Sequence, residues 1–208
     1  MVVCIICKVP GGLAEVFTYK GAANDGIVAV SSNAATCTGY YTRKLCDELA
    51  AVTGGGNVDR SLPIIRYAEM LLNYAEASNE LGHTNDALDA LKQIRERAGI
   101  IPGANAMYGL PETPSKEELR AIIQNERAIE LAFEHHRFFD LRRWKLGEPL
   151  LDGKYVHGME ITKTGNNYTY KRINVRTRYF KEIYYYLPIP RKDVTINPNL
   201  LQNPGGYN

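Results

Sequence analysis

The sequence has almost no excess of either charge: 25 lysines and arginines face 23 aspartates and glutamates, which leaves a formal net charge of +2. This near-balance excludes binding of nucleic acid or of an anionic membrane by bulk electrostatics. No apolar run approaches the roughly 20 residues that a membrane-spanning helix requires. With 45% hydrophobic and 23% charged residues, the composition also excludes wholesale disorder. A length of 208 residues therefore indicates a globular chain of one or two domains.

Cysteine is scarce too, and its spacing is uninformative. Cys4 and Cys7 form one C-x2-C pair, while Cys37 and Cys46 stand apart. A zinc ribbon needs a second short-spaced pair, so we expect four idle thiols, no metal and no cofactor. The apolar start of the chain has no basic segment and is too short for a signal peptide, and neither Cys4 nor Cys7 has the setting of a lipidated cysteine. We therefore expect no export signal in this chain.

Sequence motifs of enzymes are missing as well. No G-x-S-x-G, H-E-x-x-H, G-x-x-x-x-G-K-[ST] or G-x-G-x-x-G occurs, which disfavours nucleophilic hydrolysis, zinc catalysis and nucleotide binding. What is abundant is tyrosine, with 14 residues against 5 Phe and 1 Trp. Tyrosine combines an apolar ring with a polar tip, so this excess favours binding surfaces as readily as core.

Residues 1–60 are broken by glycines and predict loops with one or two short strands, such as 27–30. From Ser61 a helical period begins, with Ser61 as the predicted N-cap, and it ends at Gly82. A second helix is predicted from Asn85 to Ala98, before Gly99. The spacing of Ala75, Gly82 and Ala87 resembles a tetratricopeptide repeat, in which small side chains let two antiparallel helices approach closely.

A third helix is predicted to begin at Ser115, because Ser115 and Glu118 form a capping box. Its pattern continues as far as Trp144. Beyond Gly147 the sequence alternates, and residues 165–167 between 159–163 and 168–175 predict a β-hairpin. The Pro- and Asn-rich tail from Pro188 onward predicts an extended, irregular coat over the helices.

The densest charge is in residues 126–144, where Glu126, Glu130 and Glu134 share one face of the predicted helix. A pair of carboxylates there could serve glycoside hydrolysis. A di-metal site is disfavoured because the segment has no Glu-x-x-His. The interpretation we favour is an ion-pair lattice that ties the helix to its neighbours. The arginines expected to supply it are Arg127, Arg137, Arg142 and Arg143.

The segment 171–178 interleaves cations with nearby tyrosines, a pattern that can bind single-stranded nucleic acid, although the small net charge favours a solvated strand face. The candidate ligand-binding residues are Tyr155, Tyr168 and Tyr170, because they lie in the turn-rich region beside Asn166 and Asn167. An alternative is that Tyr168 and Tyr170, two residues apart on one strand face, pack on a helix. We predict no catalytic residue.

Four motifs in order carry a resemblance to a known family. They are Leu62–Ala77, Glu126–Trp144, Tyr186-Leu187-Pro188-Ile189-Pro190 and Gln202-Asn203-Pro204-Gly205. From about Thr38 to Tyr207 the chain resembles the C-terminal half of the SusD/RagB family of outer-membrane nutrient-binding lipoproteins of Bacteroidetes. The resemblance implies a mainly α fold, a tetratricopeptide-like α-α superhelix with a short β-hairpin and long irregular loops. Residues 1–60 would form a loop-rich segment with short strands, and residues 61–208 the helical domain.

The resemblance also implies a function. It implies carbohydrate binding for glycan uptake at the cell surface, an oligosaccharide ligand, and a SusC-like TonB-dependent transporter as partner. Attachment to the outer membrane would use a lipid anchor absent from this chain, which the resemblance identifies as a C-terminal fragment. The sequence departs from the family pattern at His135, where Gly is usual, and at Gly205-Gly206, which has one Gly more. A glycan hydrolase and a protein-docking helical repeat without a small-molecule ligand stay as alternatives.

Overall fold

The computed structural model describes residues 6–7, 16–22, 26, 36–42, 44–45, 63–204 and 207. The chain divides into two compact units, one of residues Leu62–Phe139 and one of the remaining residues, and each is described by itself. Two sequence-based expectations lie outside the described residues: the strand at 27–30 and the N-cap at Ser61. Among the described residues, no helix is both long and apolar enough to cross a membrane.

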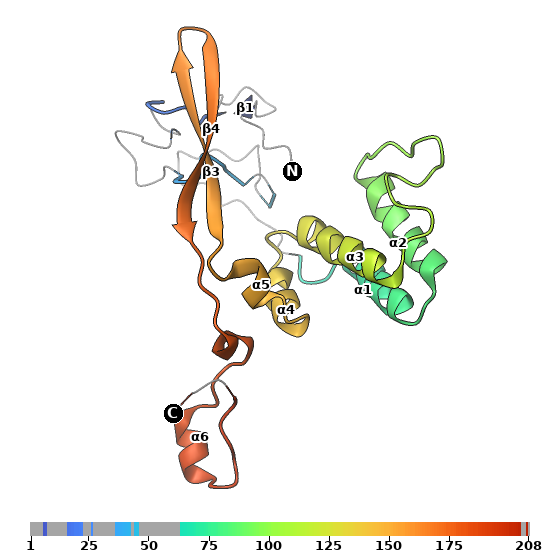
Figure 1. Ribbon diagram of the computed structural model, residues 1–208, viewed down its shortest axis with the longest axis vertical. Helices are drawn as coiled ribbons and strands as arrows, with labels where there is room; N and C mark the ends of the chain where they lie inside the picture. Colours follow the sequence, from blue (N-terminus) through green and yellow to red (C-terminus); the bar gives the residue numbers. More distant parts are fainter. Residues whose placement is uncertain are drawn as a thin grey trace. The chain divides into compact units, whose positions relative to one another are not determined.

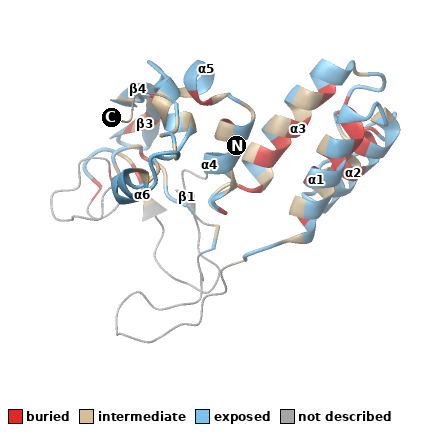
Figure 2. Ribbon diagram, turned by 90° about the horizontal axis from the view of Figure 1, so that it is seen from below, coloured by how far each residue is buried: buried red, intermediate tan, exposed pale blue. Residues whose placement is uncertain are grey.

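Three helices make up the core of the unit 62–139: α1 (Tyr67–Glu80), α2 (Thr84–Arg97) and α3 (Lys116–Glu130). Figure 1 shows α1 and α2 as an antiparallel pair with α3 beside them. The buried residues form a stripe on each helix (Figure 2). Leu72, Leu91 and Leu119 are fully buried in one shared cluster, and so are Ala75 and Ala87. The mainly α fold with a paired-helix unit is therefore confirmed.

Of the four ends of α1 and α2, the two C-terminal ends follow the sequence signals and the two N-terminal ends do not. Gly82 and Gly99 adopt φ of +82° and +78° directly after the two helices, a left-handed conformation in which glycine has no Cβ penalty. α2 begins at Thr84, one residue before the predicted cap at Asn85. The start of α1 was predicted wrongly. It begins at Tyr67, because Arg66 is still extended at φ −127° and ψ 152°.

The third helix starts as predicted and stops early. Ser115 accepts a hydrogen bond from the Glu118 backbone, and the Glu118 carboxylate binds the Ser115 N–H, which completes the capping box. The helix ends at Glu130, and a new helix, α4 (His136–Arg143), follows. The prediction of one helix to Trp144 is therefore wrong. Phe133 and His135 have φ of +65° and +67°, which no right-handed helix can include. His135 is the position where the resembled family has Gly.

The second unit contains the predicted hairpin, and its strands are longer than expected. β3 (Tyr155–Thr164) and β4 (Asn167–Thr177) pair antiparallel from Thr164–Asn167 to Tyr155–Thr177, with a register shift between Val156 and His157. The loop is only Gly165 and Asn166, since Asn167 already belongs to β4. A second, minimal pair joins β1 (Ile6–Cys7) to β2 (Val16–Phe17).

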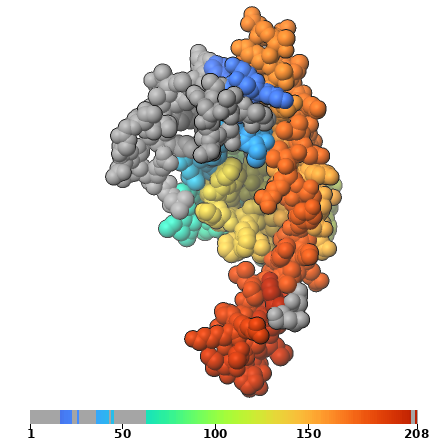
Figure 3. All heavy atoms as spheres, turned by 90° about the vertical axis from the view of Figure 1, so that its left-hand side faces the viewer, coloured from blue at the N-terminus to red at the C-terminus, as the bar shows by residue number. Residues whose placement is uncertain are grey.

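Residues from the N-terminal part line the free edge of β3. The Lys20 N–H donates to the Ile161 carbonyl at 2.7 Å, and the Met159 N–H donates to the Thr38 carbonyl at 2.8 Å. Gly158 permits this approach, because a Cβ there would lie 2.8 Å from the Thr38 oxygen. Figure 3 shows the blue atoms of residues 16–22 against the orange hairpin.

The remaining elements are short: α5 (Gly147–Leu151), the 3-10 helix η1 (Glu182–Tyr185) and α6 (Arg191–Ile196). α6 contradicts the prediction of an irregular tail. The tail also binds to itself: the Gln202 amide exchanges hydrogen bonds with the backbone of Ile189, and Asn203 donates to the Leu187 carbonyl. Two motifs that carried the family resemblance thus bind to each other, because the side-chain amides satisfy backbone carbonyl and N–H groups of the Pro-containing segment 186–190, which belongs to no helix or strand.

Candidate functional site

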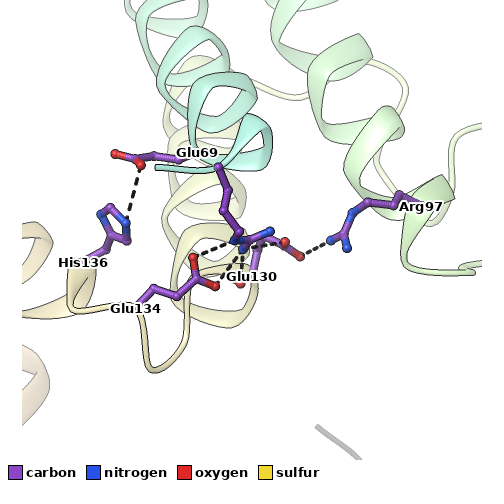
Figure 4. A network of polar contacts seen from close by, with 6 residues as sticks. Glu69, Arg97, Glu130, Glu134 and His136 are labelled. Carbon is purple, nitrogen blue, oxygen red and sulfur yellow. Dashed lines mark hydrogen bonds and ion pairs between the residues drawn. The ribbon is translucent and has the colours of Figure 1, made fainter. Parts of the chain in front are cut away.

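The three glutamates singled out from the sequence form an ion-pair lattice in the unit 62–139. Arg66 donates to both oxygens of Glu134, at 2.7 and 2.8 Å, and to Glu130 Oε1 at 3.0 Å. Arg97 donates to Glu130 Oε2 at 2.5 Å. All four carboxylate oxygens of Glu130 and Glu134 therefore accept from a guanidinium (Figure 4).

Glu126 has an arginine of its own. Arg95 donates to Glu126 Oε2 through Nε at 3.0 Å and Nη2 at 2.9 Å, and its Nη1 donates to the Tyr108 carbonyl. Glu126 is 8% exposed, so the paired guanidinium is what makes its burial tolerable. The pair joins α2 to α3 and to the loop between them.

The lattice is confirmed, and three of its arginines, Arg66, Arg95 and Arg97, were not among the predicted ones. Arg66, Arg95 and Arg97 come from before α1 and from the end of α2, far from the glutamates in sequence. Of the predicted cations, Arg127 donates to Asn73 at 2.7 Å and Arg143 pairs with Asp140 at 2.8 Å. Glu134 also lies past the end of α3, so the three glutamates do not share one helix. The side-chain hydrogen bonds that Arg66 donates to Glu134 raise the pKa of Arg66 further above its ordinary value.

A histidine extends the lattice region toward α1. Nε2 of His136 lies 3.6 Å from Oε2 of Glu69, and both side chains are largely buried. Figure 4 shows this pair beside the Glu134 contact. The pair anchors the start of α4 to α1.

The structure separates the predicted tyrosines. Tyr168 and Tyr170 lie near the tip of the hairpin, whereas Tyr155 begins β3 and pairs with Thr177 at the other end. Tyr170 pairs with Ile161, six residues from Tyr155, so roughly 20 Å of strand separates the two positions. Tyr155 contacts His157, with 6.4 Å between ring centroids, and Tyr168 contacts Tyr19 at 6.3 Å. No helix among the described residues covers Tyr170, which is 54% exposed.

A second surface was not anticipated from the sequence. Exposed side chains of α1 and facing residues of α2 line two adjoining hollows of about 420 and 670 Å³. Tyr67, Met70 and Tyr74 are 72%, 43% and 54% exposed. Their spacing of three and four residues was the available signal, because it places them on one helix face. Asp86, Asp89 and Gln93 of α2 provide polar groups along the first hollow.

No metal centre emerges from the part of the chain that the structure describes, since it contains no cluster of three or more potential His, Cys, Asp or Glu ligands. Of the four cysteines, the structure describes the side chain of Cys37, an exposed free thiol. The unit 62–139 therefore holds an arginine-neutralised carboxylate lattice and one tyrosine-bearing surface, and the other unit holds the tyrosines of the hairpin. Such surfaces can bind ligands through rings and hydrogen bonds.

Comparison with known proteins places this architecture in a family. A statistical model described as the SusD family matches residues 18–207. The chain belongs to the SusD family. SusD-like protein P2 of Formosa agariphila is 34% identical over 160 residues, which are 76% of this chain and 28% of that protein.

Solved SusD-like structures agree. A SusD-like protein from Bacteroides fragilis is 33% identical, with a TM-score of 0.57 over 71% of this chain and 26% of its own. The structure of BT4246 gives 32% identity and a TM-score of 0.64 over 83% of this chain and 30% of its own. The present chain thus spans less than a third of the length of these relatives, and the SusD-like helical fold is shown for that part.

Proposed function

We propose that this SusD-family chain is part of a non-catalytic glycan-binding protein. Its carboxylates of greatest catalytic promise, Glu130 and Glu134, have every oxygen bound by Arg66 or Arg97. A glycosidase needs one carboxyl group to donate a proton and another to attack or activate water. Carboxylates clamped by guanidinium groups are available for neither step, and this observation carries the proposal.

The full-length protein would then act at the cell surface. We propose that it is held at the outer membrane and delivers bound oligosaccharide to a SusC-like TonB-dependent transporter. Family membership supports this proposal. Co-purification of the full-length protein with such a transporter from detergent-solubilised outer membranes is the expected result. Recovery of the protein without any transporter would contradict the partnership.

The test of the binding role is a comparison of binding with turnover. Oligosaccharides are titrated into the chain, and the same mixtures are then analysed for cleavage products by chromatography. We expect binding without cleavage, and the Glu130→Gln variant should lose thermal stability but no activity. Cleavage that disappears in Glu130→Gln would replace the binding role with that of a hydrolase.

A second candidate is a protein-docking surface without a small-molecule ligand. The hollows along α1 and α2, with exposed Tyr67, Met70 and Tyr74, favour it, because an apolar helix face with polar rims fits another protein. The test is oligosaccharide binding by a Tyr67→Ala, Tyr74→Ala double variant. If this variant still binds oligosaccharide, the groove is not the glycan site and stays available for docking of a protein.

A further inference from the structure

The register of the hairpin places two tyrosines and two cations on one face. Lys163 pairs with Tyr168, Ile161 with Tyr170 and Met159 with Arg172. Residues directly opposite each other in an antiparallel pair project to the same side, and so do alternate residues of one strand. Lys163, Tyr168, Tyr170 and Arg172 therefore share one surface, called here the hairpin face.

The hairpin carries a local positive charge that the whole chain does not. Residues 155–177 contain four cations, Lys163, Lys171, Arg172 and Arg176, against the single acid Glu160, whereas the entire chain has a formal charge of only +2. Glu160 itself lies 3.6 Å from Lys20. Within the described residues, Arg172 has no ion pair or hydrogen bond with its side chain, and it is exposed.

The tyrosines of this face have complementary roles. Tyr168 is held in place by the Tyr19 ring at 6.3 Å and by Lys163, whose Nζ lies 5.8 Å from its centroid. Tyr170 is 54% exposed, and its ring makes no aromatic contact among the described residues. An open ring beside a positioned one gives a platform on which the apolar side of a sugar can stack.

We propose that the hairpin face binds an oligosaccharide that carries carboxylate or sulfate groups; this inference rests on the proposed glycan-binding function. Tyr170 stacks on a sugar ring, and Arg172 binds an anionic substituent. The planar guanidinium matches a carboxylate or sulfate with two parallel hydrogen bonds. A neutral glycan leaves this charge unmatched, so the cations favour charged ligands. Nucleic acid is disfavoured because stacking of successive bases needs more than one open ring.

The experiment compares matched ligands and matched variants of the intact chain. Short oligogalacturonate is titrated beside its methyl ester, and a sulfated galactan oligosaccharide beside its desulfated form, with binding followed by NMR chemical shifts. The two pairs distinguish carboxylate from sulfate as the recognised group. Arg172→Gln removes one cation of the hairpin face, while Lys171→Gln removes a neighbouring cation that lies on the opposite face, across from Glu160 in the strand register.

We expect at least one charged oligosaccharide to bind about fivefold more tightly than its neutral form, an effect the size of one exposed ion pair. Arg172→Gln should abolish this preference and Lys171→Gln should retain it. Tyr170→Ala should weaken the charged and neutral forms alike. Heat unfolding of each variant verifies that the fold is unchanged.

Four results would overturn the inference. Equal binding of charged and neutral forms removes the anion preference and leaves the glycan-binding function standing. Absence of binding by all four oligosaccharides rejects the inference together with glycan binding by this chain. An equal loss of the preference for the charged form in Lys171→Gln shows generic charge attraction. Tighter Arg172-dependent binding of a single-stranded oligonucleotide than of any glycan shows nucleic-acid recognition instead.

Discussion

Arg66 and Glu134, 68 residues apart, form a bidentate ion pair in which Nε and Nη2 of the arginine donate to the two carboxylate oxygens at 2.7 and 2.8 Å. The pair joins the residue that precedes α1 to the loop that follows α3. The Glu134 side chain is only 3% exposed, and the guanidinium of Arg66 helps to compensate its buried charge. One contact thereby ties the start of the first helix to the end of the third.

Replacement of Arg66 should destabilise the protein strongly. Arg66→Ala removes both hydrogen bonds that the arginine donates to the buried Glu134 carboxylate, and we expect a loss of about 2–3 kcal/mol in the free energy of unfolding. Arg97→Ala is the matched control, because Arg97 is 57% exposed and its loss should cost less than about 1 kcal/mol. Urea denaturation measures both values. Equal effects of the two substitutions would contradict the role assigned to Arg66.

The left-handed residue His135 should gain from substitution by glycine. A non-glycine residue at its φ of +67° carries strain of about 1–2 kcal/mol, whereas glycine loses about 0.5–1 kcal/mol through chain entropy. His135→Gly should therefore increase the free energy of unfolding by about 0.5–1 kcal/mol and raise the Tm. Ala132→Gly, in the same loop at an ordinary φ, should lower it. A lower Tm for His135→Gly would show that the imidazole contributes more than the strain removes.

Gly147 should not tolerate a side chain. A Cβ at this position would lie 2.3 Å from the Phe180 ring, and Phe180 is only 5% exposed. Helix propensity alone would make Gly147→Ala favourable by about 1 kcal/mol, but overpacking should make it unfavourable by about 1–3 kcal/mol. The double variant Gly147→Ala, Phe180→Leu should recover part of the loss. Additive effects in calorimetry would exclude this contact as the cause.

The ion pairs of Glu80 predict an acid dependence of stability. The hydrogen bond from Arg120, together with that from Lys116, lowers the pKa of Glu80 from 4.5 to about 2. Because the folded pKa lies below the unfolded one, the contribution is fully present above pH 4.5 and is lost as the pH falls toward 2. The three side chains are well exposed, so salt should weaken the effect.

Glu80→Gln is the test of this dependence. The difference in urea midpoint between the native chain and the variant should shrink as the pH falls from 4.5 to 2, and it should be smaller at high salt. A difference that stays constant over this range would mean that the ionised carboxylate contributes nothing beyond its neutral amide equivalent.

The sequence by itself determined the helix ends and the hairpin that are formed by contacts between neighbouring residues. The capping box of Ser115 and Glu118, the terminating glycines Gly82 and Gly99, and the hairpin around Gly165 all involve contacts within a few residues. Such contacts form from the local backbone with little loop-closure entropy, so their pattern predicts them. Ala75 and Ala87 likewise indicated a close helix pair, and both are fully buried.

Tertiary structure alone decided which side chains meet. The arginines of the glutamate lattice were predicted from nearby sequence, but Arg66 comes from the residue before α1 and Arg95 and Arg97 come from α2. The break of the third helix required positive φ at Phe133 and His135, a region that is uncommon for residues other than glycine. The hairpin register separated Tyr155 from Tyr168 and Tyr170 and set Arg172 beside the open ring. These outcomes depend on how whole helices and strands pack. Spacing along the sequence does not specify which distant residues come into contact, and the packing of these elements does.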